Sequence, residues 1–274
     1  MIIKSITIEN LGAVDVFSCD FLDDLNIVKS RATEELAQAI NIVLNHKFSS
    51  PLSCCRARED TKITATVCIL GKIYSIQAVH DMTRHTFVLS AANQCGEDAT
   101  VEYLYLMSHC QAQDEAEMFN GTEKMHRFRL MYYLNSECDS APYELKRNVD
   151  DFLHNKTFRS HLSKFVKGFK PEPIRAGKPY ELIVRKNGIF DVQSAIDRAQ
   201  SVFLSESERR LFGYLCFLRT AELWCEFEEL RNLHAVKKPL VVTNFLERLD
   251  ESIDTKELLL RTRQLNRQAI ILTM

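Results

Sequence analysis

Two short apolar segments near the end of the sequence constrain the fold most strongly. Residues 240–242 (LVV) follow Pro239, residues 269–272 (AIIL) come later, and a helical pattern over 255–266 separates them. Strands that are apolar on both faces are typical of parallel sheets, which helices cover on both sides. Because two parallel strands need a crossover connection, the order strand–helix–strand predicts an α/β fold with a parallel core.

The N-terminal part adds strands of a different kind. Residues 2–8 and 14–21 alternate apolar and polar side chains around a turn at Asn10-Leu11-Gly12. Residues 61–70 and 73–79 flank Gly71-Lys72, which is a hairpin signal, and residues 86–90 add another strand. Between these antiparallel hairpins, the apolar run 25–28 and a one-sided helical pattern over 33–44 predict a buried strand followed by a helix.

Helical periodicity dominates the middle of the sequence, from residue 101 to about 168. Residues 180–185 and 189–190 flank Asn187-Gly188 and predict a further hairpin. Ser205 then begins a long helix that runs to about Leu230. We therefore predict one domain over 1–274, with an N-terminal lobe (1–100), a helical insertion (101–175) and a C-terminal lobe (176–274).

Composition excludes several classes of protein. Hydrophobic residues make up 46% and charged residues 26%, which is ordinary for a globular protein. The formal net charge of −2 attracts neither nucleic acid nor membranes as a whole, and no apolar run is long enough to cross a membrane. The N-terminus lacks the pattern of a secretory signal, so we expect a cytoplasmic protein without a membrane partner.

Nine cysteines and eight histidines provide no metal-ligand spacing. No C-x-x-C pair occurs, and Cys54 and Cys55 are adjacent. Free cysteines inside apolar segments behave as small hydrophobic residues, so we expect reduced thiols, no metal and no cofactor.

Several segments together resemble the ATPase heads of the RecF/SMC group of ABC-type proteins. Residues 1–28 are similar to the opening strands that lead to the P-loop, and residues 204–218 (LSESERRLFGYLCFL) resemble the signature helix. Residues 237–250 (KKPLVVTNFLERLD) look like the Walker B strand and D-loop, and 266–273 like the strand before the switch histidine. The resemblance implies an ABC-head-like mixed sheet, with the helical middle segment in place of a coiled coil.

The segment that aligns with the P-loop lacks the residues that bind phosphate. A P-loop uses glycines to wrap its backbone N–H groups around phosphates, a lysine for the outer phosphates and a hydroxyl for magnesium. Lys29, Ser30, Arg31 and Thr33 occupy these places, without glycine and about three residues short. Acidic residues follow at the helix N-terminus, where phosphate would bind. The simplest interpretation is an ordinary loop, with Lys29 or Arg31 as a phosphate contact the alternative.

The other nucleotide motifs also depart from the family pattern. Thr243 and Asn244 stand where Walker B has its two acids, which hold magnesium and orient water. Asp250 matches the D-loop aspartate, and a carboxylate displaced to this loop is the alternative. In the signature-like segment Ser207 replaces glycine, while Ser205 and Glu208 match the family and also have capping-box spacing. We expect no switch histidine after the strand at 269–272.

These departures predict a catalytically inactive head, a pseudo-ATPase without a small-molecule substrate. Such a head would act as an interaction module, as a homodimer or with an intact ATPase partner, in DNA maintenance or a mobile element. Residual nucleotide binding without hydrolysis is one alternative, although the sequence offers no phosphate cradle. An enzyme of another class is a further alternative, but the sequence lacks G-x-S-x-G and H-E-x-x-H motifs.

A basic stretch supports the remaining alternative, nucleic-acid binding. Residues 156–186 contain nine Lys or Arg and two acids, with Phe158, Phe165 and Phe169 interleaved. Such a patch attracts phosphates. The competing interpretation is a solvated helix face over core phenylalanines. The candidate residues are Lys156, Arg159, Lys164, Lys167 and Lys170, followed by Arg175, Lys178, Arg185 and Lys186.

Overall fold

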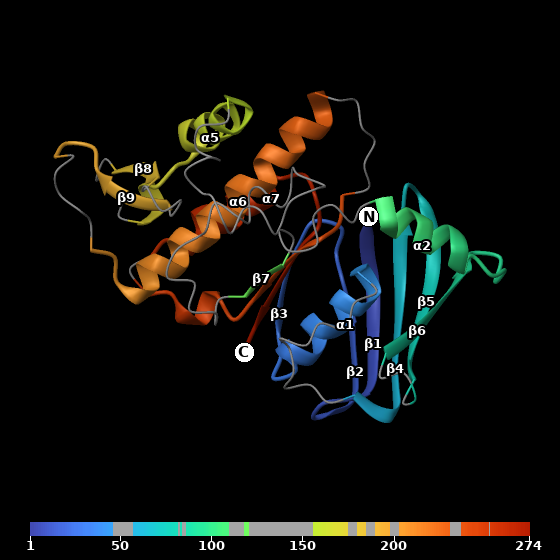
Figure 1. The fold of residues 1–274 in the computed structure, drawn as a ribbon. Helices are drawn as coiled ribbons and strands as arrows, with labels where there is room; N and C mark the ends of the chain where they lie inside the picture. Colours follow the sequence, from blue (N-terminus) through green and yellow to red (C-terminus); the bar gives the residue numbers. More distant parts are fainter. Residues whose placement is uncertain are drawn as a thin grey trace. The chain divides into compact units, whose positions relative to one another are not determined.

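The computed structural model describes residues 1–45, 57–81, 83, 86–109, 118–120, 156–174, 180–184, 190–197, 203–230, 237–251 and 253–274. The chain divides into two compact units, which we describe separately. Unit 1 comprises Met1–Met118, His234–Asn244 and Asn266–Met274, and unit 2 comprises Phe119–Leu233 and Phe245–Leu265. Unit 1 therefore combines both ends of the sequence (Figure 1).

Unit 1 contains an antiparallel sheet with one buried face. Its strands, in order, are β2 (Val14–Asp20), β1 (Ile2–Leu11), β4 (Ala57–Ile69), β5 (Lys72–Asp81) and β6 (Thr86–Asn93). Burial alternates along β5, where Tyr74 and Ile76 are buried and Ser75 is exposed. The predicted hairpins are confirmed, but the turn between β4 and β5 is Leu70-Gly71, one residue earlier than predicted. Both turn residues have positive φ, 50° and 82°, which matches the twist of the flanking strands.

The second sheet contains the predicted parallel core. Its strand order is β3 (Leu25–Lys29), β11 (Ala269–Thr273), β10 (Leu240–Thr243) and β7 (Met118–Asn120), and β11 pairs in parallel with both β3 and β10. All residues of β10 and β11 are buried, as their apolar composition predicts. The strand β7 corrects the prediction of helix for this stretch, because periodicity cannot identify a strand of three residues. The helical predictions for 110–117 and 121–155 lie outside the described residues.

The helix α1 (Thr33–Asn45) packs between the two sheets of unit 1. It contacts β1 and β5 of the antiparallel sheet and β10 and β11 of the parallel sheet. Every residue from Leu36 to Leu44 is buried. A second helix, α2 (Thr100–His109), packs near α1, and the hydroxyl of Tyr103 donates a 2.7 Å hydrogen bond to the carbonyl of Val43.

Unit 2 is built around the long helix α6 (Glu206–Leu230). The other elements are α5 (Lys156–Gly168), the 3-10 helices η3 (Glu172–Ile174) and η4 (Leu246–Arg248), the hairpin β8 (Tyr180–Val184) and β9 (Phe190–Ser194), and α7 (Thr255–Arg263). The ring centroids of Tyr214 in α6 and Phe245 lie 4.3 Å apart, and the Tyr214 hydroxyl shares a 2.7 Å hydrogen bond with the hydroxyl of Thr262 in α7. Burial raises the pKa of Tyr214 to about 12, so its hydroxyl is neutral well above physiological pH.

The described helices include none that is long and apolar enough to cross a membrane. Among the same residues, no three His, Cys, Asp or Glu side chains gather in a group that could hold a metal ion.

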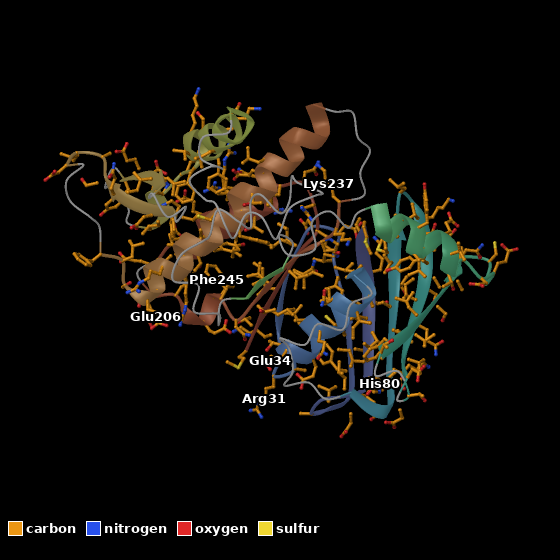
Figure 2. All side chains as sticks on the ribbon, viewed as in Figure 1. Arg31, Glu34, His80, Glu206, Lys237 and Phe245 are labelled. Atoms are coloured by element: carbon orange, nitrogen blue, oxygen red, sulfur yellow. The ribbon has the colours of Figure 1, made fainter. Side chains whose placement is uncertain are left out.

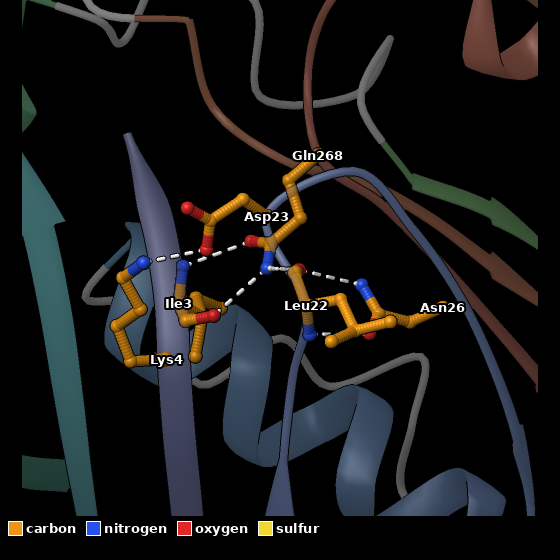
Figure 3. Close-up of polar contacts among 6 residues, drawn as sticks. All are labelled: Ile3, Lys4, Leu22, Asp23, Asn26 and Gln268. Carbon is orange, nitrogen blue, oxygen red and sulfur yellow. Dashed lines mark hydrogen bonds and ion pairs between the residues drawn. The ribbon is translucent and has the colours of Figure 1, made fainter.

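The side chain of Gln268 connects the two sheets of unit 1. Its amide accepts a 2.8 Å hydrogen bond from the N–H of Ile3 in β1 and donates 2.8 Å hydrogen bonds to the carbonyls of Ile3 and Leu22 (Figure 3). The amide of Asn26 in β3 pairs with both backbone groups of Leu22, at 2.7 and 2.9 Å. Gln268 is only 1% exposed, so these bonds form away from water.

Another glutamine of unit 1 is equally buried and differs in its hydrogen bonding. Gln38 of α1 is 1% exposed, and among the described residues neither atom of its amide group has a hydrogen-bond partner. A buried polar group without a partner costs about 1–3 kcal/mol, whereas a bonded group stabilises the fold.

Substitution of each glutamine by methionine therefore has opposite predicted effects. Gln268→Met leaves the N–H and C=O groups of Ile3 without partners and should lower the free energy of unfolding by about 2–4 kcal/mol. Gln38→Met replaces an unpaired amide by an apolar side chain of similar volume and should raise the free energy of unfolding by about 1 kcal/mol. Urea unfolding of both variants measures this difference, and equal losses of stability would contradict it.

Candidate nucleotide-handling site

The carboxyl ends of three parallel strands meet at one edge of unit 1. Lys29 of β3 lies opposite Thr273 of β11, and Thr243 of β10 lies opposite Leu272. The residues directly after β3 and β10 also bond to β11. The N–H of Ser30 donates a 3.0 Å hydrogen bond to the carbonyl of Thr273, and the N–H of Asn244 donates one of 3.2 Å to the carbonyl of Leu272. Ligands of α/β proteins bind at such an edge. The predicted P-loop and Walker B positions are therefore neighbours in unit 1.

The connection from β3 to α1 consists of Ser30, Arg31 and Ala32 only. The hydroxyl of Ser30 accepts a 3.0 Å hydrogen bond from the N–H of Ala32, and the carbonyl of Ala32 accepts the first helical bond, 2.9 Å from Leu36. Lys29 and Arg31 are exposed, and Thr33 is buried. The connection is therefore a tight turn that uses the amide of Ala32 internally.

The first turn of α1 carries two carboxylates with different surroundings. Glu34 is exposed near Arg31 (Figure 2). The carboxylate of Glu35 accepts a 3.2 Å hydrogen bond from the N–H of Ala13, in the turn between β1 and β2. Gly12 makes this approach possible, because its φ is +59° and a Cβ atom there would lie 2.7 Å from Oε1 of Glu35. Both acids give negative charge to the end of the helix where a phosphate would otherwise be favoured.

The end of β10 carries no carboxylate: its last residue is Thr243, and Asn244 follows. Thr243 is 6% exposed and Asn244 is 4% exposed. Asn244 has φ of +52°, a conformation that asparagine tolerates better than most residues, and here the chain passes from unit 1 to unit 2. Thr243 and Asn244 thus place a neutral hydroxyl and a neutral amide at the positions that the resemblance predicts for the two acids of Walker B.

The signature-like segment of unit 2 forms the predicted capping box. The hydroxyl of Ser205 accepts a 3.2 Å hydrogen bond from the N–H of Glu208, and the carboxylate of Glu208 accepts one of 2.7 Å from the N–H of Ser205. These paired bonds satisfy two free amides at the start of α6. Ser205 is exposed at the surface.

Ser207 joins the signature-like segment to the D-loop-like segment. Its hydroxyl accepts a 2.8 Å hydrogen bond from the N–H of Asp250, across 43 residues of sequence. Ser207 is 8% exposed, whereas Asp250 is exposed, so the bond is sheltered and the carboxylate faces solvent. This contact was not predicted, because no local pattern indicates it. It fixes the backbone at Asp250 beside the first turn of α6, so the exposed residues Ser205 and Asp250 belong to one part of the surface of unit 2.

The basic stretch divides into core residues and surface residues. Phe165 and Phe169 are buried and their rings stack on each other, and Phe169 also packs edge-on against Phe212 of α6, so both belong to the core of unit 2. Lys164, Lys167 and Lys170 are exposed. Lys156 and Arg159 lie in the first part of α5. Arg175, Lys178, Arg185 and Lys186 lie outside the described residues, and nothing is described of the side chain of Phe158.

Arg219 attaches the end of α5 to α6. Its guanidinium donates hydrogen bonds to the carbonyls of Lys164 (3.0 Å) and Phe165 (3.4 Å) and pairs with Glu222 at 3.2 Å. A Cβ atom on Gly168 would lie only 2.0 Å from this guanidinium, so a larger residue there would displace the end of the Arg219 side chain. Lys164 and Lys167 thus lie on a helix that is fixed to the core, and Lys170 follows the end of that helix.

Comparisons with solved structures support the fold. No protein-family profile matches the sequence, and no curated protein matches it. The structure of the recombination mediator protein RecF with ATP has a TM-score of 0.56 and 13% identity, covering 99% of this chain and 93% of that chain. The Smc head domain of Pyrococcus furiosus, bound to the C-terminal domain of ScpA, has a TM-score of 0.55 and 13% identity, covering 100% and 89%. The predicted RecF/SMC-like head fold is confirmed.

The hydrogen bond between Ser207 and Asp250 can be tested separately from the capping box. Ser207→Ala removes the acceptor, so the Asp250 amide should exchange with solvent faster, with a stability loss of about 1 kcal/mol. Ser205→Ala removes a helix cap and should cost a similar amount without changing exchange at Asp250. Amide hydrogen exchange of the two variants distinguishes the roles, and unchanged Asp250 protection in Ser207→Ala would contradict the contact.

Proposed function

We propose that this chain is a RecF/SMC-type head that serves as a protein-interaction module and does not hydrolyse ATP. The observation that carries the proposal is the three-residue connection Ser30-Arg31-Ala32 between β3 and α1. Wrapping a triphosphate needs several consecutive free amides in a glycine-rich loop. This connection has no glycine, and its Ala32 amide is already bonded to Ser30.

The end of β10 supports the same proposal. Neither Thr243 nor Asn244 carries a charge at neutral pH, so this position lacks both a hard anionic ligand for magnesium and a base for the attacking water. Glu247 and Asp250 belong to unit 2 and are exposed. Two parts of the candidate site therefore support the proposal that the chain does not hydrolyse ATP.

The surface around Ser205 and Asp250 supports the interaction role. Its backbone is held by the capping box and by the Ser207–Asp250 bond, so the surface is formed without a ligand. A preformed surface loses less conformational entropy on binding. We propose that this surface binds the head of an intact ATPase of similar fold, in the cytoplasm and in DNA maintenance or on a mobile element. The names of the fold neighbours, a recombination mediator and an Smc head bound to ScpA, motivate this choice.

The first part of the test concerns nucleotide. Isothermal titration with ATP and Mg²⁺ should detect no binding, and ATPase activity should stay at background. The double variant Thr243→Asp, Asn244→Glu should remain inactive, because the short connection at Ser30 still provides no phosphate cradle. Micromolar ATP affinity would support residual nucleotide binding instead, and turnover by the unmodified chain would overturn the proposal.

The second part concerns the partner. An intact head ATPase encoded beside this chain should co-purify with it in the absence of ATP. Asp250→Arg should weaken the complex by about tenfold or more, equivalent to about 1.4 kcal/mol. Glu251→Arg, an equally exposed neighbour, serves as the matched control and should have a smaller effect. A complex that is indifferent to Asp250 would show that another surface binds the partner.

Nucleic-acid binding is a second candidate function, favoured by the exposed lysines of α5 and its C-terminal extension. Lys164, Lys167 and Lys170 are exposed near a helix end that Arg219 holds in place. The segment 156–174 contains five Lys or Arg and one acid, whereas the whole chain has a net charge of −2. Because Phe165 and Phe169 are buried, this surface offers phosphate contacts without base stacking from these rings.

Charge neutralisation tests this second function. Lys164→Gln with Lys167→Gln should weaken binding to DNA at low salt and reduce the slope of log affinity against log salt by about 2 for two lost phosphate contacts. Lys72→Gln with Lys256→Gln removes the same charge from other exposed positions and should leave the slope unchanged. Fluorescence anisotropy over a salt series measures both, and equal slopes would exclude this helix as the binding surface.

A further inference from the structure

The strand β3 leaves one edge of the parallel sheet unpaired among the described residues. The sheet begins with β3, whose described partner is β11. Asp24 accepts a 2.7 Å hydrogen bond from Ala269, and Ser30 donates one of 3.0 Å to Thr273. Since the backbone groups of a strand alternate in direction, Asp24, Asn26, Val28 and Ser30 face β11. The N–H and C=O groups of Leu25, Ile27 and Lys29 therefore face the open edge.

The side chain at the centre of this edge is apolar and exposed. Ile27 is 48% exposed, whereas its neighbours Asn26 and Val28 are buried or partly buried on the side of the core. An unpaired edge with a β-branched residue at its centre is a template for a further strand.

Charged residues of opposite sign lie before β3 and at its carboxyl end. Asp23, whose side chain is 61% exposed, precedes the strand and forms an ion pair with Lys4 at 2.5 Å. Lys29 and Arg31 are exposed at the other end. In an antiparallel pair of two β3 strands related by a twofold axis at Ile27, Ile27 lies opposite Ile27 of the second copy, and Asp23 lies opposite Arg31. Because the contact is isologous, the pairing of Asp23 with Arg31 occurs twice, once on each side of the twofold axis.

The edges of the antiparallel sheet do not offer this complementarity. The edge strand β2 carries Asp15 and Asp20 and no Lys or Arg, so two copies would bring like charges together. At the other edge, the backbone of Ala91 in β6 is bonded to Thr100 and Ala99 at 2.9 and 2.8 Å, so the following turn covers part of it.

We propose that two copies of this chain associate through antiparallel pairing of their β3 strands, which joins the two parallel sheets across a twofold axis. The occupant of the edge is a second copy, because this register places Asp23 and Arg31, which flank β3, opposite each other in the two copies. This contact uses unit 1 and is independent of the proposed surface at Ser205 and Asp250, so variants of that surface should leave self-association unchanged.

Proline substitution tests the backbone pairing directly. The N–H of Ile27 faces away from β11, so Ile27→Pro preserves that ladder and removes a donor at the open edge. Sedimentation equilibrium should show dimers for the unmodified chain and a dissociation constant raised by about tenfold or more for Ile27→Pro, equivalent to about 1.4 kcal/mol. Val16→Pro on the edge strand β2 is the matched control and should leave the dimer intact. A monomeric unmodified chain at all concentrations would overturn the proposal.

Cross-linking provides a test that does not depend on the folding of a proline variant. Cα atoms of a hydrogen-bonded antiparallel pair lie about 5.5 Å apart, within the range of a disulfide. Ile27→Cys should form an intermolecular disulfide under mild oxidation, faster than the unmodified chain with its nine native cysteines. Val16→Cys is the control and should cross-link no faster than the unmodified chain. Equal rates for Ile27→Cys and Val16→Cys would overturn the twofold pairing.

Discussion

Unit 1 depends on the burial of one helix between two sheets. From Leu36 to Leu44 the residues of α1 are buried, so the helix has no solvent face along that length and its position is fixed by packing on both sides. The buried amide of Gln268 adds directional bonds from the start of β11 to β1 and to the loop before β3. Because β3 and α1 are both held in this way, the connection between them has a fixed span. Three residues cover that span here.

The sequence predicted the elements whose period or composition is strong. The apolar segments at 240–242 and 269–272 are the parallel strands, and the one-sided pattern over 33–44 is the central helix. Local signals also identified the hairpins and the capping box of Ser205 and Glu208, since each depends on residues close in sequence. The helix predicted to reach residue 266 ends at Arg263, and Asn266 adopts φ of +51° before β11. Elements of this kind are predictable to within a few residues because their signal is local.

The contacts that organise the candidate site could not be predicted in the same way. Gln268 bonds to Ile3 across 265 residues, and Ser207 bonds to Asp250 across 43. A glutamine before a strand or a serine in a first helical turn has many ordinary explanations, and no local pattern distinguishes them. The phenylalanines of the basic stretch show the opposite case. Their spacing was compatible with stacking on bases or with a core, and the burial of Phe165 and Phe169 favours the core.

Three backbone amides in the candidate segments donate hydrogen bonds to side chains of the same chain. The amide of Ala32 bonds to Ser30, that of Ala13 to Glu35, and that of Asp250 to Ser207. Free amides at helix starts are groups that bind phosphate, and the amide of Ala32, directly before α1, is bonded to a side chain here. Each internal bond lowers the free energy of the unliganded state, so a ligand that displaced it would have to replace that bond as well. Side chains of the chain itself therefore bond to backbone amides that a ligand could otherwise contact at these three positions.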